Sequence, residues 1–143
     1  MDRMQLVAPC GVNCGNCGLL EENITEDIRA RLAEFRSITP DDAVCKGCRS
    51  EQGNCVYIGD TCATWACAEK IGVTYCFECG EFPCVKLLPS AKGAHRGHNI
   101  KLYNLCRMQR NGIEAWMDES AQIQKLYFEG ELVVGQGPVL EDE

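Results

Sequence analysis

Cysteine spacing is the feature of this sequence that most constrains how the chain folds. Twelve of the 143 residues are cysteine, and most of them stand in short clusters instead of being spread along apolar faces. The spacing C-x2-C, which lets two sulfurs reach one metal ion at about 2.3 Å, occurs three times. These pairs are Cys14/Cys17, Cys45/Cys48 and Cys76/Cys79. A glycine follows or lies inside each pair and relieves the strain of a tight turn, so the pattern indicates thiolate metal binding.

Disulfide bonds are the main alternative use of so many cysteines, and they require an oxidising compartment. The first nine residues contain no apolar run of the kind found in secretory signals. No stretch of about 18 apolar residues is present to cross a membrane. We therefore expect a cytoplasmic protein without a membrane partner, in which the thiols stay reduced and available to metal.

Every cysteine except Cys106 is a candidate metal ligand, and eight of these candidates lie at residues 45–84. Eight thiolates suffice for two sites of four, and such closed sites are structural because no position is left for a substrate. One division gives the first site Cys45, Cys48 and Cys55 with either Cys62 or Cys67, and the second Cys76, Cys79 and Cys84 with the other; an interleaved division is equally allowed. The full set is Cys10, Cys14, Cys17, Cys45, Cys48, Cys55, Cys62, Cys67, Cys76, Cys79 and Cys84.

The N-terminal cysteines form a triad, Cys10, Cys14 and Cys17, with no fourth ligand nearby in the sequence. The fourth position is either open, as chemistry would require, or filled by a distant side chain. The distant candidates are Cys106, His95 and His98.

The ligand type leaves two kinds of metal centre open, because thiolates suit both zinc and iron–sulfur clusters. C-x2-C beside glycine favours zinc, and the ferredoxin run C-x2-C-x2-C-x3-C-P is missing. We predict two or three zinc ions in a non-catalytic interaction module. The alternative is an iron–sulfur protein in redox or sulfur-handling chemistry, with [4Fe-4S] clusters and an open-site cluster on the triad. No Ser-His-Asp pattern or nucleotide-binding glycine loop is present, so we lean against an enzyme.

Charge bears on the choice of partner. The chain has a formal net charge of −7, and four thiolates around a divalent ion add further negative charge. Phosphate backbones repel such a surface, so nucleic acid is disfavoured and another protein is the expected partner.

Apolar periodicity predicts a small, metal-stabilised α-rich (α+β) domain made of cysteine knuckle loops and short helices. A first helix is expected over 23–37, opened by a capping box of Asn23 and Glu26. A second spans Thr64 to Lys70 and ends at Gly72, and a third runs from Pro83 to Leu88.

The C-terminal part is expected to form a helical hairpin over 98–128, with a break at Asn111-Gly112. A short strand is expected at Leu132 to Val134, followed by a flexible acidic tail over 135–143. One domain over 1–143 is predicted, with its metal-binding region at 8–88.

The motifs resemble those of an uncharacterised family of small cysteine-rich bacterial and archaeal proteins, catalogued as a domain of unknown function. The resemblance covers residues 8–117 and implies no particular activity. It rests on the CGxxCGxC start at Cys10–Cys17, on Cys45–Cys48, on Cys67–Cys76, on the CxxCxEFPC centre at Cys76–Cys84, on Asn104-Leu105 and on Gly112–Trp116.

Overall fold

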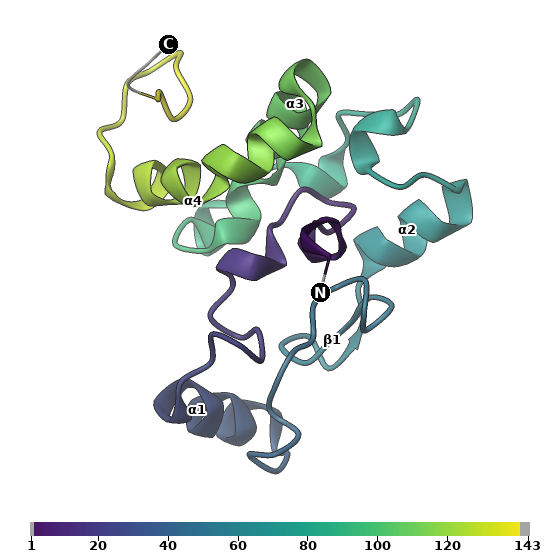
Figure 1. Ribbon diagram of the computed structural model, residues 1–143, viewed down its shortest axis with the longest axis vertical. Coiled ribbons are helices and arrows are strands. Elements are labelled where there is room, and N and C mark those ends of the chain that lie inside the picture. The colour runs from purple at the N-terminus through teal and green to yellow at the C-terminus, as the bar shows by residue number, and fades with distance from the viewer. Residues whose placement is uncertain (1, 141–143) are drawn as a thin grey trace. The chain divides into compact units, whose positions relative to one another are not determined.

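The computed structural model describes residues 2–140, and its regular structure is mostly helical (Figure 1). The α-helices are α1 (Glu26–Arg36), α2 (Ala63–Ile71), α3 (Lys101–Asn111) and α4 (Ile113–Glu129). Short 3-10 turns are η1 (Arg3–Leu6), η2 (Cys14–Asn16), η3 (Cys76–Glu78), η4 (Val85–Leu87), η5 (Ala91–Gly93) and η6 (Gly97–Ile100). Strand β1 (Asn54–Cys55) pairs antiparallel with β2 (Asp60–Thr61). The predicted α-rich α+β class is confirmed.

Two compact units make up the described chain. Unit 1 contains residues 2–9 and 13–74, and unit 2 contains residues 10–12 and 75–140. Two compact units can belong to one domain, so the predicted single domain stays a prediction. No helix within residues 2–140 combines the length and apolar character needed to cross a membrane.

Helix α1 of unit 1 begins later than predicted. Its N-cap is Thr25, whose hydroxyl accepts a hydrogen bond from the Ile28 N–H at 3.3 Å. The predicted capping box at Asn23 is therefore wrong, because the Asn23 amide is used elsewhere. Thr25 holds the extended backbone conformation that an N-cap needs.

The interior of unit 1 includes a small cluster beneath α1. Leu32 and Ala33 of α1 pack on Ala43, and partly buried Leu19, Ile24, Val56 and Tyr57 surround them. Phe35 is 63% exposed and stacks on Tyr57 at 5.6 Å between ring centres. Helix α2 ends at Gly72 with a φ of +81°, as predicted.

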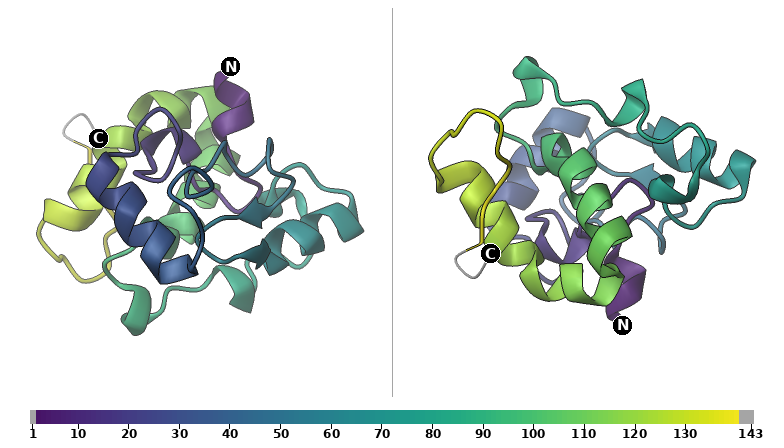
Figure 2. Two further views of the ribbon diagram at one scale, coloured as in Figure 1. Left: turned by 90° about the horizontal axis from the view of Figure 1, so that it is seen from below. Right: turned by 90° about the horizontal axis from the view of Figure 1, so that it is seen from above.

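Unit 2 is centred on the helical hairpin of α3 and α4, which lie side by side in Figures 1 and 2. Gly112 joins the helices with a φ of +89°, so the predicted hairpin and its break are confirmed. Arg107 of α3 bonds Glu119 of α4 at 3.1 Å. The most deeply buried side chains of the hairpin are Leu105, Met108, Trp116 and Ile123.

Two predicted elements of unit 2 are wrong. The helix from Pro83 to Leu88 is only the 3-10 turn η4, since Pro89 disfavours helical backbone at Leu88 and few residues remain. The segment from Leu132 to Val134 forms no strand. Its end residues are each 91% exposed, and a strand without a paired neighbour has nothing to hold it.

The described part of the C-terminal tail contacts the hairpin. The Tyr103 hydroxyl donates to the Pro138 carbonyl at 2.7 Å, and Leu140 is buried. Residues 141–143 of the predicted flexible tail lie outside the described residues, and the flexibility of the tail stays a prediction.

Candidate metal centre

Unit 1 brings the segment after Cys17 against Cys45. Leu20 and Cys45 form a parallel bridge. The Cys45 N–H donates to the Leu19 carbonyl at 3.1 Å, and the Cys45 carbonyl accepts from Glu21 at 2.8 Å. Backbone hydrogen bonds thus hold the segment just after Cys17 against Cys45.

The opposite ends of the same two pairs also meet. The Cys48 N–H donates to the Cys14 sulfur at 3.4 Å, across 34 residues of sequence. Gly47 has a φ of +95°, and a side chain there would begin 3.8 Å from Cys14 Cβ. Cys14/Cys17 and Cys45/Cys48 therefore face each other as two adjacent pairs.

Backbone N–H groups point at several of the sulfurs, as they do in metal-binding knuckle turns. The Cys17 sulfur accepts from Leu19 at 3.5 Å, and the Cys45 sulfur accepts from Gly47 at 3.4 Å. In unit 2 the Cys79 sulfur accepts from Glu81 at 3.4 Å. Hydrogen bonds of this kind orient the sulfur of a potential ligand.

The electrostatics of Cys45 show which other thiols lie near it. Burial raises the pKa of the Cys45 thiol, while the hydrogen bond from Gly47 lowers it. The neighbouring Cys55, Cys17 and Glu51 raise that pKa further. The thiols of Cys55 and Cys17 are thus near enough to Cys45 to act on its charge.

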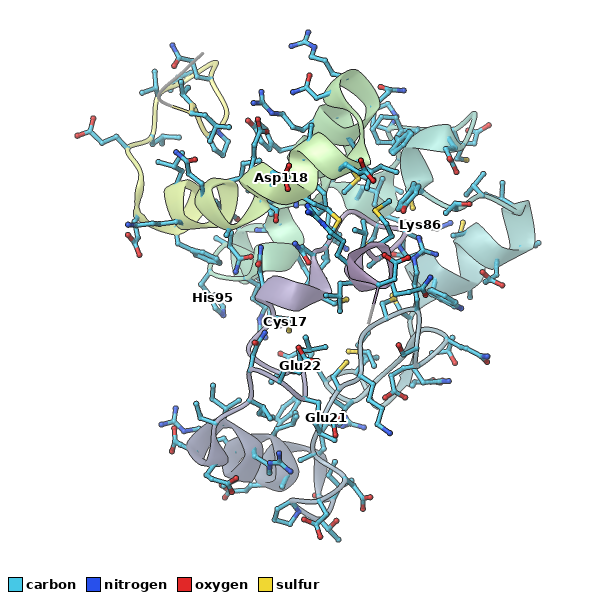
Figure 3. The ribbon with its side chains drawn as sticks, viewed as in Figure 1. Cys17, Glu21, Glu22, Lys86, His95 and Asp118 are labelled. Carbon is cyan, nitrogen blue, oxygen red and sulfur yellow. The ribbon has the colours of Figure 1, made fainter. Side chains whose placement is uncertain are left out.

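Asn23 is a site residue that the sequence analysis missed. Its side-chain amide donates to the Gly15 carbonyl at 2.8 Å and to the Cys17 carbonyl at 2.9 Å. Figure 3 labels Cys17 and, on the segment that leads to α1, Glu21. Asn23 therefore holds the turn that carries Cys14 and Cys17. In the sequence, Asn23 stands just before a helix and looks like an N-cap. The sequence therefore contains no signal for its contact with the cysteine turn.

The remaining candidate ligands fall into both units. Cys62 precedes α2 and Cys67 lies within it, both half-buried in unit 1. Unit 2 contains the half-buried Cys76, Cys79 and Cys84, together with the buried Cys10. The predicted triad is thus divided, with Cys10 in unit 2 and Cys14 and Cys17 in unit 1; a centre on the whole triad stays a prediction.

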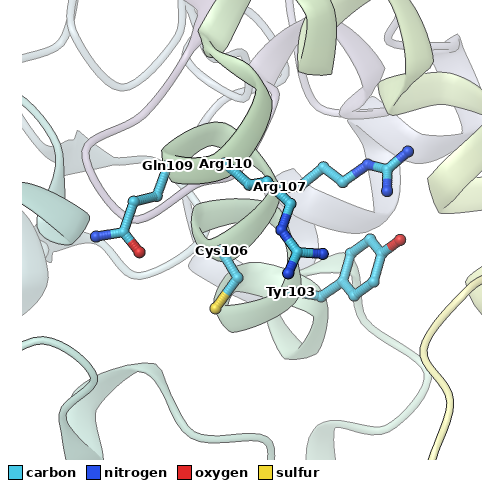
Figure 4. Close-up of a pocket in the computed structure, with 5 residues that line it drawn as sticks. All are labelled: Tyr103, Cys106, Arg107, Gln109 and Arg110. Atoms are coloured by element: carbon cyan, nitrogen blue, oxygen red, sulfur yellow. The ribbon is translucent and has the colours of Figure 1, made fainter.

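The proposed distant ligands are exposed. Cys106 opens into a surface pocket of α3 (Figure 4). His95 and His98 lie at the surface of unit 2. Partial desolvation, with Lys101 and Arg96 nearby, lowers the pKa of His98. The lining residues of the pocket are Tyr103, Cys106, Arg107, Gln109 and Arg110.

The donor chemistry of unit 1 fits a thiophilic metal. No disulfide joins any two of the twelve cysteines. Within residues 2–140, no group of three or more His, Cys, Asp or Glu side chains is gathered closely enough to hold an ion. Two facing C-x2-C pairs nevertheless supply four sulfurs of one kind, the number that a structural zinc site uses.

Comparison with known proteins yields one match. No curated protein and no solved structure matches the chain. The family model that matches covers residues 6–89, which is more than half of the chain and includes every cysteine except Cys106. The expected uncharacterised family is thereby confirmed, and the chain belongs to the family described as Protein of unknown function (DUF3795).

Proposed function

We propose that the protein binds zinc through cysteine thiolates and that the bound metal stabilises a module that contacts another protein. The observation that carries the proposal is the meeting of two C-x2-C pairs in unit 1, where the Cys48 N–H donates to the Cys14 sulfur at 3.4 Å. Four thiolates on one ion leave no coordination position for a substrate. The role of such a centre is structural, not catalytic.

The residues that would hold this ion are Cys14, Cys17, Cys45 and Cys48. When bound, zinc supplies a cross-link between two segments about 30 residues apart in the sequence. The chain's own contribution is to orient the sulfurs: Asn23 holds the turn of the first pair, and the Gly47 N–H fixes the Cys45 sulfur. Ligand-orienting hydrogen bonds of this kind commonly change metal affinity by about 10–100-fold.

The partner is proposed to be a protein, met in the cytoplasm where thiols stay reduced. Unit 1 exposes Phe35 at 63%, Ile58 at 45% and Ile38 at 37%. A protein partner could cover these apolar side chains if they form one continuous patch. The net charge of −7 argues against nucleic acid.

A second candidate function is redox or sulfur-handling chemistry on an iron–sulfur cluster. The observation that favours it is burial: Cys14 in unit 1 and Cys10 in unit 2 are each 8% exposed. Limited solvent exposure is one of the features that tune cluster potentials. Thiolates bind iron–sulfur clusters as readily as zinc.

Elemental analysis with a visible absorption spectrum separates the two candidates. The protein is purified without oxygen, and zinc, iron and acid-labile sulfide are measured per chain. We expect a colourless protein that contains zinc. A brown protein with iron and sulfide in equal amounts supports the cluster instead. A folded protein that contains no metal, and takes up none when refolded with zinc, contradicts both candidates.

Two cysteine variants then test the site itself. Cys48→Ser is expected to lose one zinc ion per chain, because three thiolates bind zinc more weakly than four. Cys106→Ser is the matched control, since its thiol is exposed, and it is expected to keep every ion. A folded Cys48→Ser chain with unchanged zinc content would remove this thiol from the site.

A further inference from the structure

Cys10 is held in unit 2, although only three residues separate it from Cys14 of unit 1. It is 8% exposed. The carbonyl of the next residue, Gly11, accepts a hydrogen bond from the side-chain amide of Asn104 at 2.8 Å. Asn104 belongs to α3 and is itself 6% exposed, so a buried polar contact fixes the Cys10 turn to this helix.

Gly11 brings that turn into direct contact with α3. Its φ is +88°, and a side chain there would begin 2.9 Å from Leu105 Cγ and 3.0 Å from the Lys101 carbonyl. Real Cβ atoms do not approach backbone and side chain so closely, and positive φ already favours glycine. The turn thus lies flat against α3, and Cys10 beside it has little freedom to move.

The same helix receives the cysteines that follow α2. Turn η3, which contains Cys76, packs against α3. Cys79 ends this turn, and its sulfur accepts the Glu81 N–H at 3.4 Å. The Glu78 carboxylate accepts from the Tyr75 N–H at 2.9 Å and holds the start of the turn. Helix α3 therefore contacts both the Cys10 turn and the turn that contains Cys76.

We propose that Cys10, Cys76, Cys79 and Cys84 together bind a second zinc ion, entirely within unit 2. This inference rests on the proposed function, thiolate zinc binding, and adds a second centre with its own ligands. The run from Cys76 to Cys84 supplies three thiolates, and a closed site needs a fourth. To bind, the four sulfurs must close onto one ion, from two segments that both contact α3, the Cys10 turn and the turn of Cys76.

Cys10 is a better fourth ligand than the other donors of unit 2. Cys106 is exposed. It follows Asn104 by two residues, which places it about 200° around α3 from the side chain that bonds Gly11. His95 and His98 are exposed as well. Cys10 is the buried one, and it is of the same thiolate type as the other three.

Asn104 acts as a positioning residue for this centre. Its amide bonds the Gly11 carbonyl, and its oxygen is buried without a partner among the described residues. Burying this oxygen without a hydrogen bond costs free energy. Packing alone would therefore favour an apolar residue at position 104. Asn104→Leu removes the clamp and leaves every thiol in place. We expect about 10-fold weaker zinc binding at one of two sites.

Zinc stoichiometry of single and double variants of the full chain tests the ligand set. Cys10→Ser and Cys79→Ser are each expected to lose one ion. The double variant C10S/C79S is expected to lose no more than either, because both changes remove the same ion. C10S/C48S is expected to lose two, and the control Cys106→Ser none.

Two results overturn the second centre while leaving the first. In one, C10S/C79S loses two ions and C10S/C48S only one, which assigns Cys10 to the other centre. In the other, Cys106→Ser loses an ion that Cys10→Ser keeps. A wild-type chain without zinc contradicts the proposed function itself.

If Cys10→Ser does not fold, the wild-type chain still decides the matter. Replacing zinc by an NMR-active cadmium isotope couples each metal nucleus to the β-protons of its cysteine ligands. One cadmium signal coupled to Cys10, Cys76, Cys79 and Cys84 supports the proposal. Coupling of Cys10 to the cadmium that also couples to Cys14 or Cys48 overturns it.

Discussion

Units 1 and 2 comprise similar lengths of chain, yet their interiors differ. Of the six largest fully buried side chains among the described residues, five belong to unit 2 and one to unit 1. Unit 2 contains Trp116, Leu87, Leu105, Met108 and Ile123, and unit 1 contains Val7. Unit 1 instead buries four alanines at positions 8, 33, 43 and 68. Since burial of apolar area stabilises a fold by about 25 cal/mol per Å², unit 1 gains less from its core.

The cysteines are distributed in the opposite sense. Unit 1 has the two facing C-x2-C pairs and three further thiols, at Cys55, Cys62 and Cys67. Small folds with too little core depend on cross-links through disulfides or metal. The comparison teaches that apolar packing is greatest around α3 and α4, whereas unit 1 has the smaller buried side chains and the larger share of the thiols.

Metal removal should change the stability of unit 1 relative to unit 2 more than any mutation does. Structural zinc contributes about 10–16 kcal/mol in small zinc-dependent folds. With a strong chelator we expect amide hydrogens of α1 and of residues 45–62 to exchange freely, while α3 and α4 keep more of their protection through their apolar core, although the proposed second ion of unit 2 is removed as well. Hydrogen exchange read by mass spectrometry measures both units in one sample. Equal loss of protection in the two units would refute the contrast.

Removal of the largest core side chain should destabilise unit 2 next most strongly. Trp116 is 0% exposed, and Trp116→Ala should cost about 3–5 kcal/mol through lost burial and the cavity left behind. Urea unfolding followed by the protection of α3 and α4 gives the value. The matched control is Trp65→Ala in unit 1, whose side chain is only half-buried and should cost less. A larger loss of unfolding free energy for Trp65→Ala would show that apolar packing stabilises unit 1 more than unit 2.

The helical elements were largely predictable from the sequence, because their signals are local. Gly72 and Gly112 mark helix ends through positive φ, and apolar spacing gives the α3–α4 hairpin. The errors occur where a distant contact decides. Asn23 bonds Gly15 and Cys17 instead of capping α1, and the segment after Leu132 has no strand to pair with.

The candidate site was predictable in its residue types but not in its grouping. C-x2-C spacing identifies thiols suited to metal. It cannot reveal that Cys48 meets Cys14, or that Cys10 lies in unit 2 apart from Cys17. That grouping depends on long-range hydrogen bonds, from the Cys48 N–H to the Cys14 sulfur and from the Asn104 amide to the Gly11 carbonyl, which leave no periodic trace in a single sequence.

The Asn23 side chain offers a test of unit 1 with a smaller change in free energy. Asn23→Ala removes two exposed hydrogen bonds to the turn of Cys14 and Cys17, which should cost about 1–2 kcal/mol. It should also weaken zinc binding by unit 1 about 10-fold, as measured by competition with a chromophoric chelator. Thr25→Ala is the control, since it removes the cap of α1 for about 1 kcal/mol and touches no cysteine turn. Zinc affinity that falls equally in both variants would show that α1, not Asn23, supports the site.

The ion pair of the hairpin should matter least. Arg107 and Glu119 are 3.1 Å apart, and their side chains are 11% and 31% exposed. Because water reaches the carboxylate and salt screens the pair, Arg107→Met should cost only about 0.5–1 kcal/mol, and the loss should shrink at high salt. Methionine keeps most of the apolar stem in place, so the change isolates charge from packing. Urea unfolding at low and high salt measures it. A loss as large as that of Trp116→Ala would mean that the apolar core of unit 2 is not sufficient without this ion pair.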